Sequence, residues 1–371
     1  MKNNILSNSI NLKDCENFWG NLENLSDKYD YPSDWASDTG YGSIDIYKDY
    51  AGLEEKYKPK VNVIHGLFMG MKKKWWIQSE AGFKALPSMI VHYETSRVFL
   101  NKLFNNKKKF YAIQHPYHII LKNYKEFKLD PKGGSVFFLP HSIGYGEIFS
   151  PSYLLRYLKN LSDKYYPIKI CVHPADINKE FLKLFKTSKF EIVCCGKRYD
   201  PLFLHRFFWL TNGIKYCLSV DLATQVFLSS VSGLEIIPLN NKIPMINWRH
   251  GNQAIYFDKP DEEYWDILEA FFTNQIDQNS FRDKCNFVTG KHLNLNSKDV
   301  LEIFKNSEKQ YFSFKWDSLK YKFWSIFEPY QIKFRSYFKA IQNRLSGNNR
   351  IIQPWSADLF YRLYKYHKSF K

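Results

Sequence analysis

Short apolar runs, separated by longer amphipathic stretches, dominate the chain between about Gly133 and Trp248. The runs are rich in β-branched and aromatic residues, which favours buried strands. They read SVFFLPHS, PIKICVHP, FEIVCCGK, QVFLSSVS and KIPMINW. The stretches between them carry apolar residues at helical spacing, in Ile148–Leu161, Phe181–Phe185 and Leu202–Leu210. Strands that alternate with helices of this length predict βαβ units and a parallel sheet.

The first third of the chain has a weaker pattern. KVNVIHG, SMIVHYE and FYAIQHP are typical of strand ends, which predicts a smaller α/β domain over residues 1–130. LDPKGGS, beside Asp130, interrupts all periodicity and is the expected linker. A second α/β domain is then expected over residues 131–300, and a helical tail over 301–371. The stretch from Ile214 to Thr224 leaves a strand and a helix end as alternatives.

Composition limits the class of protein. A chain of 371 residues is too long for one ordinary core, and 44% hydrophobic residues exclude general disorder. The net charge of +16 favours anionic partners such as nucleotides, phospholipid headgroups and acidic glycans. The N-terminus does not resemble a signal peptide, and no run of about 18 apolar residues predicts a spanning helix. Six cysteines without CxxC spacing indicate reduced thiols, no zinc site and a cytoplasmic protein.

The tail after Lys309 is basic and aromatic. Counted from Lys309 onward, it holds 13 Lys or Arg residues against 3 acidic ones, with aromatic residues interleaved as in YKFWSIF and KFRSYFKAI. Two compatible interpretations remain open. The tail packs on the first domain, or it lies as an amphipathic helix on the anionic inner face of the cell membrane.

Two strand ends in the second domain pair small or polar residues with histidine. His141, Ser142 and Gly144 follow SVFFLP, where glycine lets backbone N–H groups approach a ligand at a helix N-terminus. A turn with an ordinary helix cap is the alternative. His173 and Pro174 follow IKICV, where the histidine can donate a proton to a departing phosphate. A purely structural histidine is the alternative here.

A third strand end is a charged loop. Gly196, Lys197 and Arg198 open the sequence GKRYD after FEIVCC, and two cations beside an aromatic ring suit the rim of a nucleoside pocket. An ordinary solvated loop fits the same residues.

The fourth strand end is rich in hydroxyl groups. Ser229, Ser230, Ser232 and Gly233 are expected in a turn between a strand and a helix, with Glu235 one turn into that helix. Such a turn offers hydroxyls, free N–H groups and a helix dipole to a phosphate. The spacing from Ser232 to Glu235 fits a capping box equally well.

These motifs resemble a known group of enzymes. An HP pair followed by an SS turn, here His173-Pro174 and Ser229-Ser230, resembles bacterial GT-B sialyltransferases and capsule Kdo transferases. GKRYDPLFLHRF, VFLSSVSGLEIIPLNNKIPMI, AIQHPYHIILK and FLPHS are similar to wider capsule and lipopolysaccharide transferase families. The resemblance covers about residues 110–250. It implies two Rossmann-like domains facing a cleft, and a CMP-sugar whose phosphate is held by the histidine and the hydroxyls.

For a nucleotide-sugar donor, we expect inverting, in-line transfer of a sugar such as sialic acid or Kdo to a capsule or lipopolysaccharide glycan. A base from the first domain would deprotonate the acceptor. His65 is the first candidate, with Glu94 and Asp45 as alternatives, although a core or capping role suits His65 as well. The sequence has no DxD-type carboxylate pair, so neither a metal nor another cofactor is expected.

Two other functions fit part of the pattern. A CDP-alditol phosphotransferase of the teichoic-acid polymerase type would also pair a His-Pro strand end with a Ser-rich turn. A basic membrane- or nucleic-acid-binding protein is the non-enzymatic alternative. The basic residues form no RNA-binding motif, so nucleic acid is not an expected partner.

Overall fold

The structure is a computed structural model, which describes residues 40–54, 56–64, 86–105, 108–140, 150–176, 183, 185, 190–197, 200–239 and 262–316. Residues 1–311 form one compact unit, and residues 312–371 form another. No helix within the described ranges is both long and apolar enough to cross a membrane.

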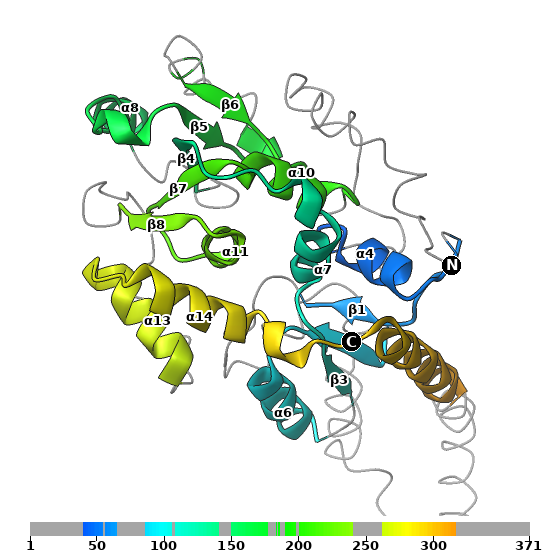
Figure 1. The fold of residues 1–371 in the computed structure, drawn as a ribbon. Coiled ribbons are helices and arrows are strands. Elements are labelled where there is room, and N and C mark those ends of the chain that lie inside the picture. The colour runs from blue at the N-terminus through cyan, green and yellow to red at the C-terminus, as the bar shows by residue number, and fades with distance from the viewer. Residues whose placement is uncertain are drawn as a thin grey trace, which may run out of the picture. The chain divides into compact units, whose positions relative to one another are not determined.

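A five-stranded parallel sheet follows the predicted linker (Figure 1). Its strands are β4 (Gly133–Phe138), β5 (Ile168–Cys171), β6 (Glu191–Val193), β7 (Ile214–Ser219) and β8 (Glu235–Pro238). The strand order is β6-β5-β4-β7-β8, and each neighbouring pair is parallel. The first three strands confirm the sequence prediction, and β7 decides the open alternative at Ile214 in favour of a strand. The chain reverses its direction of winding between β4 and β7, which is where such sheets bind ligands.

Helices connect these strands, as the periodicity predicts. α8 (Pro151–Lys159) follows β4, and α10 (Phe203–Thr211) joins β6 to β7. Pro151 stands at the first position of α8, after Ser150, whose side chain accepts a hydrogen bond from the backbone N–H of Tyr153. Both helices confirm expected ones, whereas most of Phe181–Phe185 lies outside the described residues.

The prediction of a strand at QVFLSSVS is wrong. These residues belong to α11 (Thr224–Ser232), which packs on β7 and ends at Gly233 in the left-handed region, with φ of 104°. A short apolar run does not distinguish a buried helix from a buried strand by its periodicity. The strand of this part of the chain is β7, which directly precedes α11. The run KIPMINW lies outside the described residues.

Another parallel sheet precedes the linker; it is called the first sheet below, and the five-stranded sheet is called the second sheet. The described strands of the first sheet are β1 (Asn62–Val63), β2 (Ser88–Val91) and β3 (Lys109–Ala112), in that order. They confirm the three predicted strand ends. α4 (Ser43–Tyr50) lies before β1, and α6 (Glu94–Leu103) connects β2 to β3.

The chain passes between the two sheets twice. α7 (Pro116–Asn123) leads from β3 to β4, and α13 (Glu262–Thr273) and α14 (Gln278–Val288) precede the return. A further helix over residues 297–316 then reaches the first sheet, where Gln310 accepts a 2.6 Å hydrogen bond from Ser88. Most of the predicted tail, beyond residue 316, lies outside the described residues. Short 3₁₀ turns complete the described elements: Lys125–Phe127, Asp163–Tyr165, Pro174–Asp176 and Lys291–Leu293.

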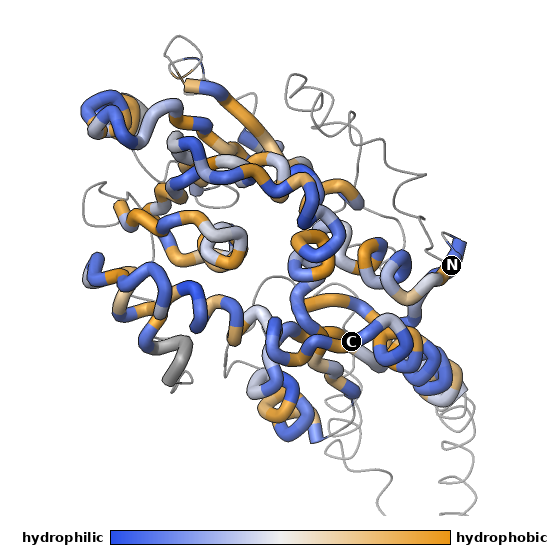
Figure 2. The backbone as a smooth tube through the Cα atoms, viewed as in Figure 1, coloured by the Kyte–Doolittle hydropathy of each residue, from blue (hydrophilic) through white to orange (hydrophobic). Residues whose placement is uncertain are grey.

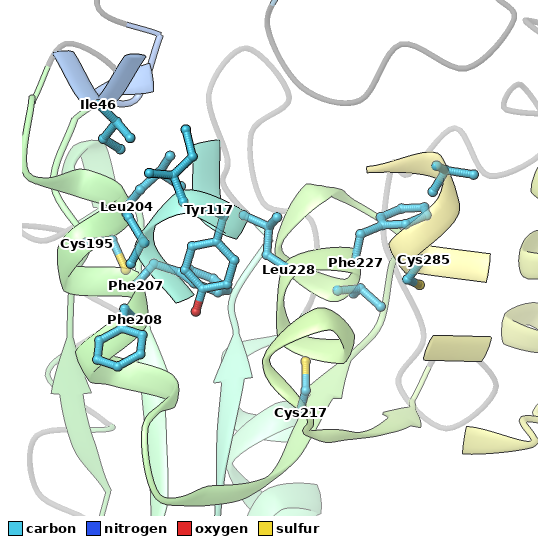
Figure 3. Close-up of a cluster of buried hydrophobic side chains, with 14 of the residues drawn as sticks. Ile46, Tyr117, Cys195, Leu204, Phe207, Phe208, Cys217, Phe227, Leu228 and Cys285 are labelled. Carbon is cyan, nitrogen blue, oxygen red and sulfur yellow. The ribbon is translucent and has the colours of Figure 1, made fainter. Parts of the chain in front are cut away.

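One hydrophobic cluster joins the elements of both sheets. Figure 2 shows the strands coloured mainly as hydrophobic, whereas hydrophilic and hydrophobic residues alternate along the helices. Figure 3 shows Tyr117 of α7 beside Phe207 of α10, with Leu228 of α11 in the same cluster. The Tyr117 hydroxyl lies 2.7 Å from Ser232 Oγ and 3.2 Å from Thr211 Oγ1. These contacts link α7 to α11 and α10, two helices that connect strands of the second sheet. Two parallel α/β sheets joined in this way form the GT-B architecture predicted from the sequence.

Candidate functional site

A cavity of about 250 Å³ lies where the carboxyl ends of the strands of both sheets meet. The second sheet contributes the ends of β4, β5 and β6 and the segment from β7 into α11. The first sheet contributes the ends of its three strands and the start of α4. The lining residues used below are Tyr41, Ser43, His92, His115, Cys171, His173, Pro174, Cys195, Gly196, Phe203, Asp221, Ala223, Thr224 and Gln225.

The N-terminus of α11 forms part of the cavity wall on the second-sheet side. Thr224 and Gln225, its first two residues, line the cavity. Ala223 stands at the N-cap position and carries no side-chain acceptor, so it cannot cap the first N–H groups. An uncapped helix N-terminus carries partial positive charge and free donors, which suits a phosphate.

Asp221 lies between β7 and this helix, 7% exposed. Its carboxyl Oδ1 lies 3.2 Å from Ser219 Oγ and accepts a longer hydrogen bond, of 3.5 Å, from Gln225 Nε2. Burial raises the pKa of Asp221 to about 6, and the Ser219 hydroxyl opposes this rise. A carboxyl group with this pKa exchanges a proton near neutral pH and can also accept hydrogen bonds from ligand hydroxyls.

The start of α4 closes the cavity from the first-sheet side. Gly42 is the N-cap of α4 with φ of 79°, and a Cβ atom at this position would lie 2.2 Å from the carbonyl oxygen of Pro201. Only glycine tolerates both conditions. Tyr41 lies against Phe203, with ring centroids 4.5 Å apart. The start of α4 and the segment that leads into α10 are therefore in close contact at this edge of the cavity.

His92, at the end of β2, is buried and has a defined tautomer. Its Nδ1 lies 3.2 Å from the carbonyl oxygen of Ile113, which can only accept, so Nδ1 carries the hydrogen. The hydroxyl of Tyr47 lies 3.4 Å from the same Nδ1 and donates to the carbonyl oxygen of Gln114. Burial lowers the pKa of His92 to about 4. At neutral pH His92 is therefore uncharged, with Nε2 as its basic nitrogen.

Two further neutral histidines lie beside it. The rings of His92 and His115 are 4.5 Å apart, edge to face, and His115 Nδ1 accepts a hydrogen bond from the backbone N–H of Tyr117. Burial, followed by the repulsion that His92 and His118 would exert in their protonated forms, holds the pKa of His115 well below its usual value. His118 Nε2 lies 2.8 Å from Thr289 Oγ1, and burial lowers the pKa of His118 to about 3.

The loop after β6 is fixed by a buried ion pair. Arg206 and Asp200 contact each other with both side chains fully buried, and Arg206 Nη1 also donates to the carbonyl oxygen of Cys195. Gly196 has φ of 100°, and a Cβ atom there would lie 2.5 Å from Asp200 Oδ2 and 2.7 Å from Arg206 Nη1. The pair therefore holds the backbone of Cys195 and Gly196 against the cavity.

The structure places some predicted residues together. His173, Pro174 and Gly196 line the cavity, and the His173 carbonyl accepts a 2.9 Å hydrogen bond from the N–H of Asp176. Lys197 follows Gly196 but is not among the described lining residues. Outside the described residues lie His65, His141, Ser142, Gly144 and Arg198.

The predicted Ser-rich turn is wrong in its geometry. Ser229 and Ser230 lie in the last turn of α11 and are fully buried, at the end of the helix that carries negative partial charge. Neither residue is among those that line the cavity. The predicted phosphate cradle and capping box both require a helix N-terminus here, and this is a helix C-terminus.

The rest of this motif is also away from the cavity. Ser232 donates to the carbonyl oxygen of Leu228, and Gly233 is the left-handed C-cap of α11. Arg282 donates to the Gly233 carbonyl and so supports the helix end. Glu235 begins β8 rather than lying in a helix, and it pairs with Lys215 at 3.6 Å.

The acidic alternatives for the base lie on the helices α6 and α4, beside the first sheet. Glu94 begins α6 and pairs with Arg97, and Asp45 lies in the first turn of α4, 3.6 Å from Lys48 Nζ. Neither is among the described lining residues. The described ranges contain no group of three or more His, Cys, Asp or Glu side chains able to hold a metal ion.

Sequence reasoning missed His92, His115, Asp221, Thr224 and Gln225. A usable signal was present, since SMIVHYE and FYAIQHP both place a histidine at a strand end. SVDLATQ likewise places an aspartate after a strand, but its strand was not assigned, so Asp221 had no expected position.

Three solved structures are similar to the chain at low identity. Medicago truncatula UGT71G1 complexed with UDP-glucose is 14% identical, with 61% of this chain and 55% of that chain covered, at a TM-score of 0.29. UDP-GlcNAc 2-epimerase from Neisseria meningitidis bound to UDP-GlcNAc is 13% identical, with 71% and 81% covered and a TM-score of 0.36. A UDP-glucose:anthocyanidin 3-O-glucosyltransferase in complex with UDP is 12% identical, with 74% and 69% covered and a TM-score of 0.30.

The match therefore spans little more than half the length of the Medicago protein. Likeness of this degree does not identify an activity for the present chain. No protein-family model matches the sequence, and no curated protein matches it.

Proposed function

We propose that the chain is a glycosyltransferase that uses a nucleotide-sugar donor. The observation that carries this proposal is the position of the cavity. It lies at the carboxyl ends of the strands of two parallel sheets, beside the β4–β7 switch point, with the uncapped N-terminus of α11 on its wall. Open parallel sheets bind nucleotides at this point, and the first sheet supplies an acceptor-side wall.

The donor would occupy the second-sheet half of the cavity. Its phosphate would accept hydrogen bonds from the first N–H groups of α11, near Thr224, with His173 as a further donor. Asp221 would accept from a hydroxyl of the sugar or ribose. A CMP-sugar donor remains part of the proposal on the strength of the His173-Pro174 motif alone, because Ser229 and Ser230 are buried elsewhere.

The acceptor would approach from the first-sheet half. An acceptor hydroxyl attacks the anomeric carbon in line while the bond from that carbon to the phosphate oxygen breaks, which inverts the configuration. The hydroxyl proton passes to a base, for which His92 Nε2 is the described candidate. The released phosphate keeps the electron pair of the broken bond, and the α11 N-terminus stabilises its charge. These steps use only residues of this chain.

A cell-surface glycan, such as capsule or lipopolysaccharide, is the proposed acceptor, and the proposed location is the inner face of the membrane. The basic, aromatic composition after Lys309 supports this part.

Nucleotide release tests the proposal. The full chain is incubated with CMP-, CDP- and UDP-linked donors and an acceptor mixture. Release of CMP or UDP with a new glycoside supports glycosyl transfer. Transfer of a phospho-alditol from a CDP-alditol would identify the phosphotransferase instead. Absence of turnover with every donor, together with absence of nucleotide binding, would contradict both enzymatic assignments.

A further inference from the structure

Two free thiols face each other in the cavity wall. Cys171 Sγ lies 3.9 Å from Cys195 Sγ, and both residues line the cavity. Cys171 ends β5 and is paired in register with Val193 of β6, and Cys195 follows Val193 by two residues. Side chains two residues apart share a face of the sheet, so the two sulfurs project together. Cys194, between them in sequence, belongs to the hydrophobic cluster on the other face.

The other described cysteines have different surroundings. Figure 3 shows Cys217 and Cys285 near α11, well apart from Cys195. Both are buried, and neither lines the cavity among the described residues. Among the described cysteines, Cys171 and Cys195 are thus the pair whose thiols face each other and also line the cavity.

The spacing of the sulfurs fits a bridging atom better than a direct bond. A disulfide requires about 2.05 Å between the sulfurs, so they would have to approach by about 2 Å. A single atom bonded to both sulfurs would require a smaller approach from the 3.9 Å found here than a direct S–S bond requires.

The protonation of the thiols and the number of ligands nearby limit which element can bridge the two sulfurs. The hydrogen bond from Cys171 and burial raise the pKa of Cys195 well above its usual value, so this thiol is protonated and a poor nucleophile. Zinc takes four ligands, and the described residues offer no group of three or more. Trivalent arsenic needs only two sulfurs from the protein, and its condensation with thiols carries their protons away as water.

We propose that Cys171 and Cys195 form a chelating dithiol site for a trivalent arsenical within the cavity. With an arsine oxide, R–As=O and two thiols give R–As(S)₂ and one water. Two As–S bonds form, the As–O bond breaks, both thiol protons leave with the oxygen, and no oxidation state changes. The bound group would sit between the segments that carry His173 and Gly196, and would exclude a ligand from that half of the cavity.

Phenylarsine oxide is the probe. Native mass spectrometry of the intact full chain is expected to show one added phenylarsenic group, with the oxygen lost as water. Dithiothreitol should remove it, and an equal thiol concentration of 2-mercaptoethanol should not. After the adduct is formed, mild unfolding and alkylation should leave Cys171 and Cys195 protected, and this mapping uses the wild-type chain.

Variants give an independent check. Cys171→Ala and Cys195→Ala should each lose the dithiol-reversible adduct, whereas Cys194→Ala, the sequence neighbour on the other face, should keep it. A full adduct in Cys171→Ala, alkylation of both cysteines in the treated wild-type chain, or release by 2-mercaptoethanol would each overturn the proposal. The readouts are mass and labelling, so they hold whether or not the chain transfers sugars.

Discussion

His92 Nδ1 lies 3.2 Å from the carbonyl oxygen of Ile113, and this contact fixes which nitrogen of the ring is basic. The hydroxyl of Tyr47 lies on the same side of the ring, so both neighbours act on Nδ1. His92 also lines the cavity, uncharged at neutral pH. A base on the acceptor side must be uncharged and must reach the substrate, and both conditions favour His92.

Replacing His92 with Gln should reduce kcat by about 10²–10⁴-fold, the usual contribution of a positioned base. Donor affinity should stay within about twofold, because His92 belongs to the first-sheet side. His292→Gln, an exposed histidine, is the matched control. Steady-state kinetics with calorimetry of nucleotide binding checks this, and a His92→Gln enzyme with normal kcat would exclude His92 as the base.

The buried histidines should make the fold sensitive to acid. Burial lowers the pKa of His92, His118 and His205 to about 4, 3 and 4, and that of His115 well below normal. The unfolded chain therefore binds more protons below about pH 6.5, and stability is lost as pH falls from there towards 4. Each group contributes a slope of about 1.4 kcal/mol per pH unit. Urea unfolding at pH 7 and pH 5 measures it.

The ionisation of Asp221 changes stability with pH in the opposite direction to the histidines, so an Asp221 variant provides the control. Its raised pKa of about 6 means that the folded state holds a proton that the unfolded state has released, so its contribution is lost as pH rises through 6. Asp221→Asn should therefore steepen the rise of stability with pH between 4 and 6. Stability that stays level between pH 7 and 5 in both proteins would contradict the assigned histidine pKa shifts.

The Asp200–Arg206 pair should matter more for folding than a surface pair. Both side chains are fully buried, so Arg206→Met leaves a buried carboxylate and should lower the free energy of unfolding by about 3–5 kcal/mol. The double variant with Asp200→Leu should regain most of this, because the isolated charge is gone. Lys215→Met removes one partner of the ion pair with Glu235, whose side chains are both partly exposed, and should change stability far less. Equal effects of the two single variants would refute the burial argument.

The tail prediction is tested separately from the cavity. Full-length protein should float with anionic liposomes at low salt and be released as salt rises, because the attraction decays over about 8–10 Å. A chain that ends at residue 316 should not float. Equal recovery on neutral and anionic vesicles would leave the tail as a packing element.

The sequence was sufficient for the parallel sheet because its strands are short, apolar and separated by clear helices, as at β4, α8 and β5. It failed at Ser229 and Ser230, where nine residues without Gly or Pro fit a helix or a strand equally well. The phosphate-suited helix start was therefore placed one element too late, at Ser232 instead of Thr224. The His92–His115 contact could not be predicted, because it depends on the register of β2 against β3.

Nucleotide binding to a variant of the α11 N-terminus tests the central claim most directly. Thr224→Glu places a carboxylate at the first position of α11, which favours the helix itself but repels a phosphate there. Ser297→Glu makes the same change at the start of the helix over residues 297–316, away from the described lining residues. In calorimetry with CMP and UDP, wild-type protein and Ser297→Glu should bind one nucleotide per chain with equal affinity. Thr224→Glu should bind at least about tenfold more weakly, with an unchanged Tm. Equal affinity in all three proteins would place the nucleotide elsewhere and contradict the account.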